Sequence, residues 1–220
     1  MRFVFWMAAG VGVATLLGAG GTLAQQFQVS AYGGYQTAPH SGVNITDGTQ
    51  FTTGWDGKSF TNPVYYGVRG TWWLDSLGMP NAGLSIDFSH TKVYSNPDNW
   101  PAGEGFTHFE FTDGLNLLTA NAFYRFSPDD QFRPYVGLGA GISIPHVELT
   151  RTSGTTFEYQ YGGPTVQLTA GFDYMLTDNW SVFTEYKGNF SMVDVAVDSG
   201  DRLSSDIITN ALNIGISFHF

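Results

Sequence analysis

The chain ends in ITNALNIGISFHF, residues 208–220, and this stretch decides the fold. From Leu212 to Phe220 every even-numbered residue is large and apolar, whereas the residues between them are small or polar. Successive side chains of a β-strand point to opposite faces. The segment is therefore predicted to be a strand with one apolar face and one face of small and polar side chains.

The same alternation recurs through most of the sequence. With the terminal segment it defines eight predicted strands, at residues 27–36, 64–73, 84–88, 118–126, 134–144, 166–176, 180–190 and 208–220. Short turns are predicted at 74–81, 127–131 and 177–179, and long connections at 37–62, 95–112, 145–163 and 191–205. Short turns that alternate with long connections are typical of outer-membrane β-barrels, whose long loops lie outside the cell. The aromatic C-terminal residue on the apolar face also resembles the terminal signature of such barrels.

Six charged residues fall on the face of the predicted strands opposite the apolar one. They are Arg69, Asp87, Arg125, Asp173, Glu185 and Lys187. A soluble lipocalin-like barrel would turn such charges toward water, but single charges among glycine, serine and threonine suit a lumen in which they pair with each other. Backbone groups cannot stay unpaired in lipid, so the sheet must close. The predicted fold is all-β: an eight-stranded antiparallel up-and-down transmembrane β-barrel of the OmpA/OmpX type, plugged by ion pairs.

Composition agrees with this class and excludes others. The 220 residues suffice for one domain. Charged residues make up 13% and aromatic residues 16%, which is unlike a disordered chain. The sequence has no cysteine, so a closed sheet must supply the stability that disulfides give many secreted proteins. A net charge of −10 argues against nucleic acid as a partner.

The first 24 residues have the pattern of a secretory signal peptide. Arg2 precedes an apolar run from Phe3 to Leu17, and Thr22-Leu23-Ala24 is an acceptable cleavage site. A transmembrane helix is the less favoured alternative, because the run is short for a bilayer and a glycine cluster follows it. The predicted domains are a signal peptide at 1–24 and an outer-membrane barrel at 25–220, exported through the periplasm.

A His-x-Glu pattern occurs twice at the long-connection end, as His108-Phe109-Glu110 and His146-Val147-Glu148. Residues two apart in a strand share a face, so each copy presents an imidazole and a carboxylate together. Antiparallel pairing about the turn near residue 129 places Glu110 opposite Glu148. All four residues have the even parity of the lipid-facing side chains. His146 is expected roughly 35 Å above the short-turn end, at the level of the outer lipid headgroups.

Two histidines and two glutamates can bind a divalent metal ion such as zinc, manganese or iron, or act as general acid and base. The alternative is a set of hydrogen-bonded polar residues above the membrane. Loop cations are predicted to contact lipid phosphate directly, although loop charges are often only solvated. These candidates are Lys58, Lys92, Arg151 and Arg202. The sequence leaves open whether His40 and His90 join the site.

Several stretches resemble the lipid A oxidase family of outer-membrane barrels. They are AYGGYQTAPHS (31–41), YYGVRGTWW (65–73), HFEFTDGLNLL (108–118), IPHVE (144–148) and DSGDR (198–202). The resemblance covers the predicted mature chain, long connections included. It implies an O₂-dependent oxidation in which the proximal glucosamine of lipid A becomes 2-aminogluconate and hydrogen peroxide is released.

The resemblance supplies no catalytic residues, and the sequence contains no flavin or nicotinamide fingerprint. A divalent metal at His108, Glu110, His146 and Glu148, with O₂ as co-substrate, is therefore the economical hypothesis. Two alternatives remain: a structural or adhesion barrel without enzymatic activity, and a hydrolase that removes acyl chains from lipid A. The expected partners are outer-membrane lipid and lipopolysaccharide, and the barrel is expected to be a monomer.

Overall fold

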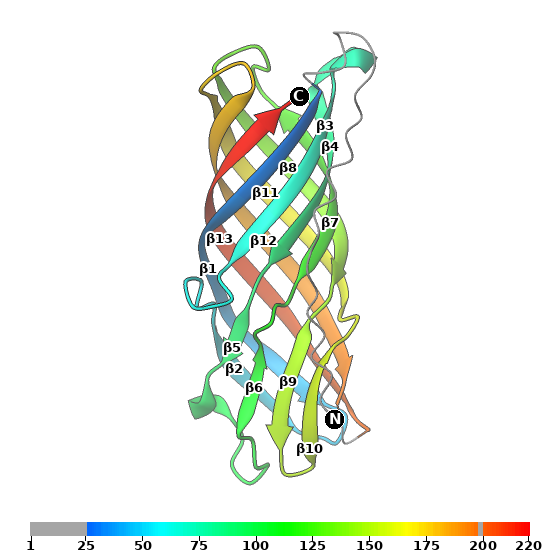
Figure 1. Cartoon of the computed structure of the whole chain (residues 1–220). Coiled ribbons are helices and arrows are strands. Elements are labelled where there is room, and N and C mark those ends of the chain that lie inside the picture. Colours follow the sequence, from blue (N-terminus) through cyan, green and yellow to red (C-terminus); the bar gives the residue numbers. More distant parts are fainter. Residues whose placement is uncertain (1–25, 198–199) are drawn as a thin grey trace, which may run out of the picture.

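A computed structural model describes residues 26–197 and 200–220, so the predicted signal peptide, residues 1–24, lies outside the described residues. Eight antiparallel strands close a tilted cylinder (Figure 1). They are β1 (Phe27–Ile45), β3 (Tyr66–Leu74), β4 (Met79–His90), β7 (Leu117–Arg125), β8 (Phe132–Ser143), β11 (Gly163–Met175), β12 (Trp180–Ala196) and β13 (Arg202–His219). The cylinder is closed because β1 pairs with β13 on one side and with β3 on the other. The prediction of an eight-stranded antiparallel barrel is confirmed.

The barrel wall is apolar outside and polar inside, as the alternation predicts. Leu138 on β8 and Ile214 on β13 are 67% and 70% exposed, although both are large and apolar. Their inward-facing neighbours along the strands are buried and mostly polar, such as Asn213 and Ser217. Exposed apolar side chains over a whole wall are costly in water and favourable in lipid. No helix in the described part of the chain is long and apolar enough to cross a membrane.

An ion-pair network fills the middle of the barrel. Arg69 donates to Glu185 at 2.8 Å, and Lys187 lies 2.7 Å from Asp87. The Tyr32 hydroxyl donates to Asp87 at 2.6 Å and also contacts the Lys187 ammonium. All four charged groups are buried. The charges satisfy each other in the low dielectric of the lumen, which is the condition under which buried ions are tolerated.

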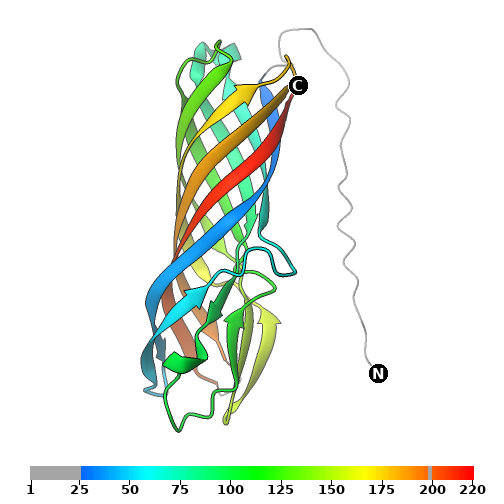
Figure 2. The same ribbon diagram turned by 90° about the vertical axis from the view of Figure 1, so that its left-hand side faces the viewer.

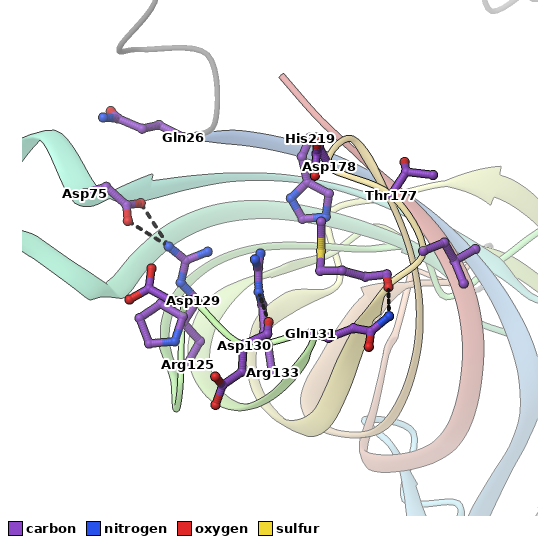
Figure 3. Close-up of a pocket in the computed structure, with 13 residues that line it drawn as sticks. Gln26, Asp75, Arg125, Asp129, Asp130, Gln131, Arg133, Thr177, Asp178 and His219 are labelled. Carbon is purple, nitrogen blue, oxygen red and sulfur yellow. Dashed lines mark hydrogen bonds and ion pairs between the residues drawn. The ribbon is translucent and has the colours of Figure 1, made fainter.

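The other two predicted lumen charges lie apart from this network, at the short-turn mouth of the barrel. Arg125 forms a bidentate ion pair with Asp75 of the short helix η1 (Asp75–Leu77), at 2.9 and 3.0 Å (Figure 3). Asp173 lies 3.6 Å from His219. Both side chains point inward, but their ion-pair partners are Asp75 and His219, not the other four predicted lumen charges. The mouth forms a pocket of about 490 Å³ that opens beside these residues.

The long connections were predicted to be loops, but they contain further strands of the same sheet. They contain β2 (Gln50–Asp56), β5 (Val93–Ser95), β6 (His108–Phe111), β9 (His146–Arg151), β10 (Gly154–Tyr159) and the short helix η2 (Pro97–Asn99). These strands pair in the order β10-β9-β6-β5-β2-β1 and continue into β13 and β12. We call this region the cap; it extends the barrel at the lower end of Figures 1 and 2.

The cap reverses the polarity of the interior without changing the direction of the side chains. Along β12 the inward residues change from Glu185 and Lys187 in the barrel to Val193 and Val195 in the cap. These valines belong to an apolar core with Phe109 and other inward residues of β6 and β9. The Gln160 side chain joins the edge beside β10 to β12, through two 2.8 Å hydrogen bonds with the Ala196 backbone. An apolar core therefore covers the polar lumen, and polar groups of the cap face outward.

Candidate functional site

The centre of the candidate site is the antiparallel pair of β6 and β9. Glu110 is paired directly with Glu148, so the predicted register is confirmed. Phe109 and Leu149 point into the apolar core of the cap and are almost fully buried. Because neighbouring residues alternate, both glutamates lie on the outer face. The predicted outward orientation of the cluster is also what the structure shows.

His108 contacts both glutamates from the β6 side. Its Nε2 atom lies 3.0 Å from Glu110 Oε1 and 3.4 Å from Glu148 Oε2. The His108 side chain is 45% exposed, whereas the two glutamate side chains are mostly covered. The imidazole thus forms the solvent-facing edge of the cluster.

His146 approaches the same carboxylate from the other side. Its Nδ1 atom lies 2.9 Å from Glu148 Oε1 and 3.8 Å from Asp113 Oδ2. The rings of Phe157 and Tyr159, on the neighbouring strand β10, cover the imidazole at centroid distances of 4.5 and 4.6 Å. His146 is consequently buried although it belongs to an outward face.

Two members of the cluster were missed by the sequence analysis. Asp113 lies outside both His-x-Glu patterns, yet it contacts His146. The Thr112 hydroxyl lies 2.9 Å from Glu110 Oε1 and 2.8 Å from Glu148 Oε1. Thr112 has the parity of His108 and Glu110, so an extension of the pattern by two residues would have found it. Asp113 lies after the end of β6, where parity gives no guidance.

The cluster fits a divalent cation by its atoms and distances. His108, Glu110 and Glu148 can each offer one atom within 4.8 Å of the others, and so can Asp113, His146 and Glu148. Imidazole nitrogen and carboxylate oxygen are ligands suited to zinc, iron and manganese. The same groups can also exchange protons with a substrate held against the outer face.

Tyr94 on β5 extends the site by one strand. It is paired with Glu110. Burial raises the pKa of the Tyr94 hydroxyl, and the charges of Glu110 and Glu148 raise it further. The Lys58 ammonium lies 3.9 Å from the centre of the Tyr94 ring, and that of Lys92 lies 5.5 Å from it. Positive charge therefore borders the acidic cluster on the β5 side.

The two lysines predicted to bind phosphate differ in access. Lys58 is exposed. Lys92 is 0% exposed, and its ammonium donates to the Thr61 carbonyl at 2.6 Å. Burial lowers the pKa of Lys92, and the nearby Lys58 lowers it further. The expectation that Lys92 contacts lipid phosphate does not fit its covered position, because the segment around Thr61 lies over its amine.

The two arginines predicted to bind phosphate are engaged elsewhere. Arg151 points into the cap and pairs with Asp47 and Asp201. It is buried, so it cannot present a guanidinium group at the outer surface. Arg202 is exposed and pairs with Asp194 at 2.9 Å, between β12 and β13 and away from the cluster. Of the four predicted cations, only Lys58 is both exposed and beside the site.

The other two histidines at the cap end, His40 and His90, lie in different surroundings. His40 is exposed at the irregular part of β1, beside Gly54 of β2, and is not in the cluster. His90 ends β4, where its ring stacks on Tyr66 at 5.3 Å. Its Nδ1 atom lies 2.8 Å from Asn116 Oδ1, and the Asn116 amide donates to the Asp113 carbonyl. His90 therefore adjoins the Asp113 side of the cluster.

The site lies just beyond the apolar wall. Strand β8 carries exposed Val136 and Leu138 on its outer face and ends at Ser143, and His146 begins β9. Tyr66, at the same end of β3, is exposed as well. Tyrosine at the margin of an apolar band is the usual mark of a membrane interface. The cluster thus lies at the cap-side margin of the exposed apolar wall.

Comparisons with known proteins identify the barrel. The chain matches the family model of the outer membrane protein beta-barrel domain over residues 8–220, and no curated protein matches it. A crystal structure of neisserial surface protein A is 16% identical, covers 88% of this chain and 97% of its own, and has a TM-score of 0.50. For the outer membrane protein OprG from Pseudomonas aeruginosa the values are 14%, 90%, 98% and 0.53.

Both structural likenesses are too low in identity to show more than the fold, and lipid A oxidation stays a prediction. The family model is different, since it matches most of the chain. The apolar outer wall and the sealed polar lumen agree with it. This protein belongs to the outer membrane protein β-barrel family and resides in the outer membrane.

Proposed function

We propose that this barrel is an outer-leaflet enzyme that oxidises lipid A. The observation that carries the proposal is the cluster of His108, Glu110, Asp113, His146 and Glu148 on the outer face of the cap. The cluster is at the membrane boundary and faces away from the sealed interior. An adhesion barrel does not need buried histidine and paired carboxylates at this place, whereas an enzyme that acts on a lipid headgroup does.

The location favours a lipid substrate over a soluble one. Ion pairs fill the lumen in the middle of the barrel, and the apolar core of the cap closes its outer end. No substrate therefore reaches the cluster from inside. A lipid of the outer leaflet can diffuse along the wall until its headgroup meets the outer face of β6 and β9. Lipid A carries phosphate, and Lys58 is an exposed cation next to the acidic groups. A phosphorylated sugar would thus have a charge partner beside the reactive groups.

The chemistry follows the resemblance to the lipid A oxidases. In lipid A whose C1 hydroxyl is free, C1 of the proximal glucosamine loses a proton and two electrons, and its hydroxyl loses a second proton. O₂ takes up both electrons and both protons and leaves as hydrogen peroxide, and water opens the resulting lactone to 2-aminogluconate. Glu110 or Glu148 would accept the hydroxyl proton, and the contact of His146 with Glu148 would hold that carboxylate in position. A divalent metal ion bound by the cluster would supply the path for electrons to O₂.

The test uses purified protein in detergent with lipid A as substrate. We expect the native protein to form hydrogen peroxide and a product with one more oxygen atom. His146→Ala and Glu110→Ala should lose both signals while the barrel stays folded. Glu158→Gln is the matched control, because Glu158 is an exposed carboxylate on β10 outside the cluster. Loss of an acyl chain would instead show a deacylase, and unchanged lipid A would show a non-enzymatic barrel.

A further inference from the structure

We propose that the cluster is a two-ion centre in which Glu148 is the bridging carboxylate. The sequence predicted one metal among four residues, but the structure contains two sets of ligands. One set is His108, Glu110 and Glu148, and the other is Asp113, His146 and Glu148. As a catalytic centre it rests on the function proposed above, whereas ion binding can be tested with metal alone.

The geometry of Glu148 separates the two sets. Its Oε2 atom faces His108 at 3.4 Å, and its Oε1 atom faces His146 at 2.9 Å. Each imidazole therefore has its own carboxylate oxygen. A carboxylate with one oxygen for each ion is the arrangement that bridges paired ions, which lie about 3.5–4 Å apart in two-metal enzymes.

The cluster carries more negative charge than its own residues can neutralise. Glu110, Glu148 and Asp113 bring three negative charges together, against two imidazoles that are neutral unless protonated. In the described ranges 26–197 and 200–220, none of these carboxylates forms an ion pair with lysine or arginine. Like charges placed directly opposite in a sheet destabilise it. Even two protonated imidazoles would leave one negative charge within the cluster, and the Lys58 and Lys92 ammonium groups lie against the Tyr94 ring on its β5 side, so bound cations are the natural complement at the two imidazoles.

His90 provides an independent indication on the Asp113 side. It is 6% exposed, and within the described part of the chain its Nε2 atom has no hydrogen-bond partner. A buried nitrogen without a partner is unfavourable, so His90 Nε2 is available to a ligand or a proton donor. Asn116 Oδ1 accepts a hydrogen bond from Nδ1–H, which leaves Nε2 with a free lone pair. This is the tautomer in which histidine binds metals or accepts a proton.

Asn116 also ties this imidazole to the second ligand set. Its side chain contacts both His90 and the Asp113 carbonyl. Asn116 holds a left-handed backbone conformation, with φ at +30°. Such a conformation is costly outside glycine and asparagine and fixes the direction of the chain at this point. His90 is therefore fixed, through Asn116, next to the chain segment that carries Asp113.

The experiment counts ions on the full chain without lipid. Metal-free barrel in detergent is mixed with Mn²⁺, free metal is removed by gel filtration, and bound manganese is measured per chain. Electron paramagnetic resonance then reports whether two Mn²⁺ ions are coupled. We expect two coupled ions in the native protein. Heat-dependent migration on gels confirms that each variant is a folded barrel.

The variants separate the two sets. Glu110→Gln and Asp113→Asn should each retain one uncoupled ion, and Glu148→Gln should weaken both. Glu158→Gln should retain two. One ion or none in the native protein, or two in Glu148→Gln, would overturn the proposal. Two coupled ions without oxidation of lipid A would support this centre and count against the proposed function alone. Oxidation of lipid A by metal-free protein would support the proposed function and count against the two-ion centre.

Discussion

Glu110 and Glu148 lie directly opposite each other across β6 and β9, and the hydroxyl of Thr112 lies within 2.9 Å of both carboxylates. One hydroxyl has one hydrogen, so it can donate to only one of them. The sheet is therefore held together here against the repulsion of two partly buried charges. Natural proteins tolerate such unfavourable placements mainly at functional sites.

Neutralising one of these carboxylates should stabilise the metal-free cap. We expect Glu110→Gln to slow amide hydrogen exchange in β6 and β9, by an amount that corresponds to roughly 0.2–1 kcal/mol. Glu158→Gln, exposed on β10, should change exchange little. Faster exchange in Glu110→Gln would show that the carboxylate pair holds the cap together.

Breaking the lumen network should destabilise the whole barrel. Lys187→Met leaves Asp87 and Glu185 buried with one cation fewer, and loss of one partner of a buried pair costs about 3–5 kcal/mol. Urea unfolding in detergent should show this loss. Arg202→Met removes an exposed pair with Asp194 and should cost at most about 1 kcal/mol. Equal losses in both variants would contradict the structural role of the lumen charges.

Two glycines of β3 should differ in their tolerance of a methyl group. A Cβ atom at Gly67 would overlap the ring of Tyr32, whose hydroxyl donates to Asp87. A Cβ atom at Gly70 would lie 3.5 Å from the Phe27 ring, an ordinary contact. We expect Gly67→Ala to lower the urea midpoint of the folded barrel and Gly70→Ala to leave it nearly unchanged. A tolerated Gly67→Ala would show that Tyr32 is free to move.

The ion pair between Asp47 and Arg151 predicts a response of the cap to acid. Burial opposes ionisation of Asp47, but the Thr49 backbone N–H and Arg151 together hold the pKa of its carboxyl below the ordinary 3.8. A depressed carboxyl pKa contributes stability above 3.8, and this contribution is lost as the pH falls through the folded value. Carbon-detected NMR titration of Asp47 should give a value below 3.8. A value at or above 3.8 would contradict the pairing.

The barrel could be predicted from the sequence because apolar and polar residues alternate along each strand, with apolar side chains facing lipid and polar side chains facing the lumen. Leu212 to Phe220 are apolar on one face, and the structure turns this face outward. Register about the 127–131 turn also placed Glu110 against Glu148. Both the apolar outer face and this register follow from the alternation of side chains along a strand, which continues until a bulge interrupts it.

The cap was not predicted, because in the cap the apolar residues of each strand face inward, whereas in the barrel they face outward. Val193 and Val195 face inward, as the lumen charges Glu185 and Lys187 do nearer the start of β12. The expectation that apolar side chains face outward therefore fails in the cap. Arg151 shares the inward parity of Leu149 and was mistaken for a surface cation. Asp113 and His90 are linked only through the side chain of Asn116, which contacts both. No spacing in the sequence encodes that contact.

The central claim is that this barrel oxidises lipid A at the outer face of its cap. The most direct test is mass spectrometry of lipid A from cells that lack the protein and carry either the native chain or His146→Ala. The native chain should add one oxygen atom to lipid A, and His146→Ala, present at the same level in the membrane, should add none. Identical lipid A from the two strains would contradict the account.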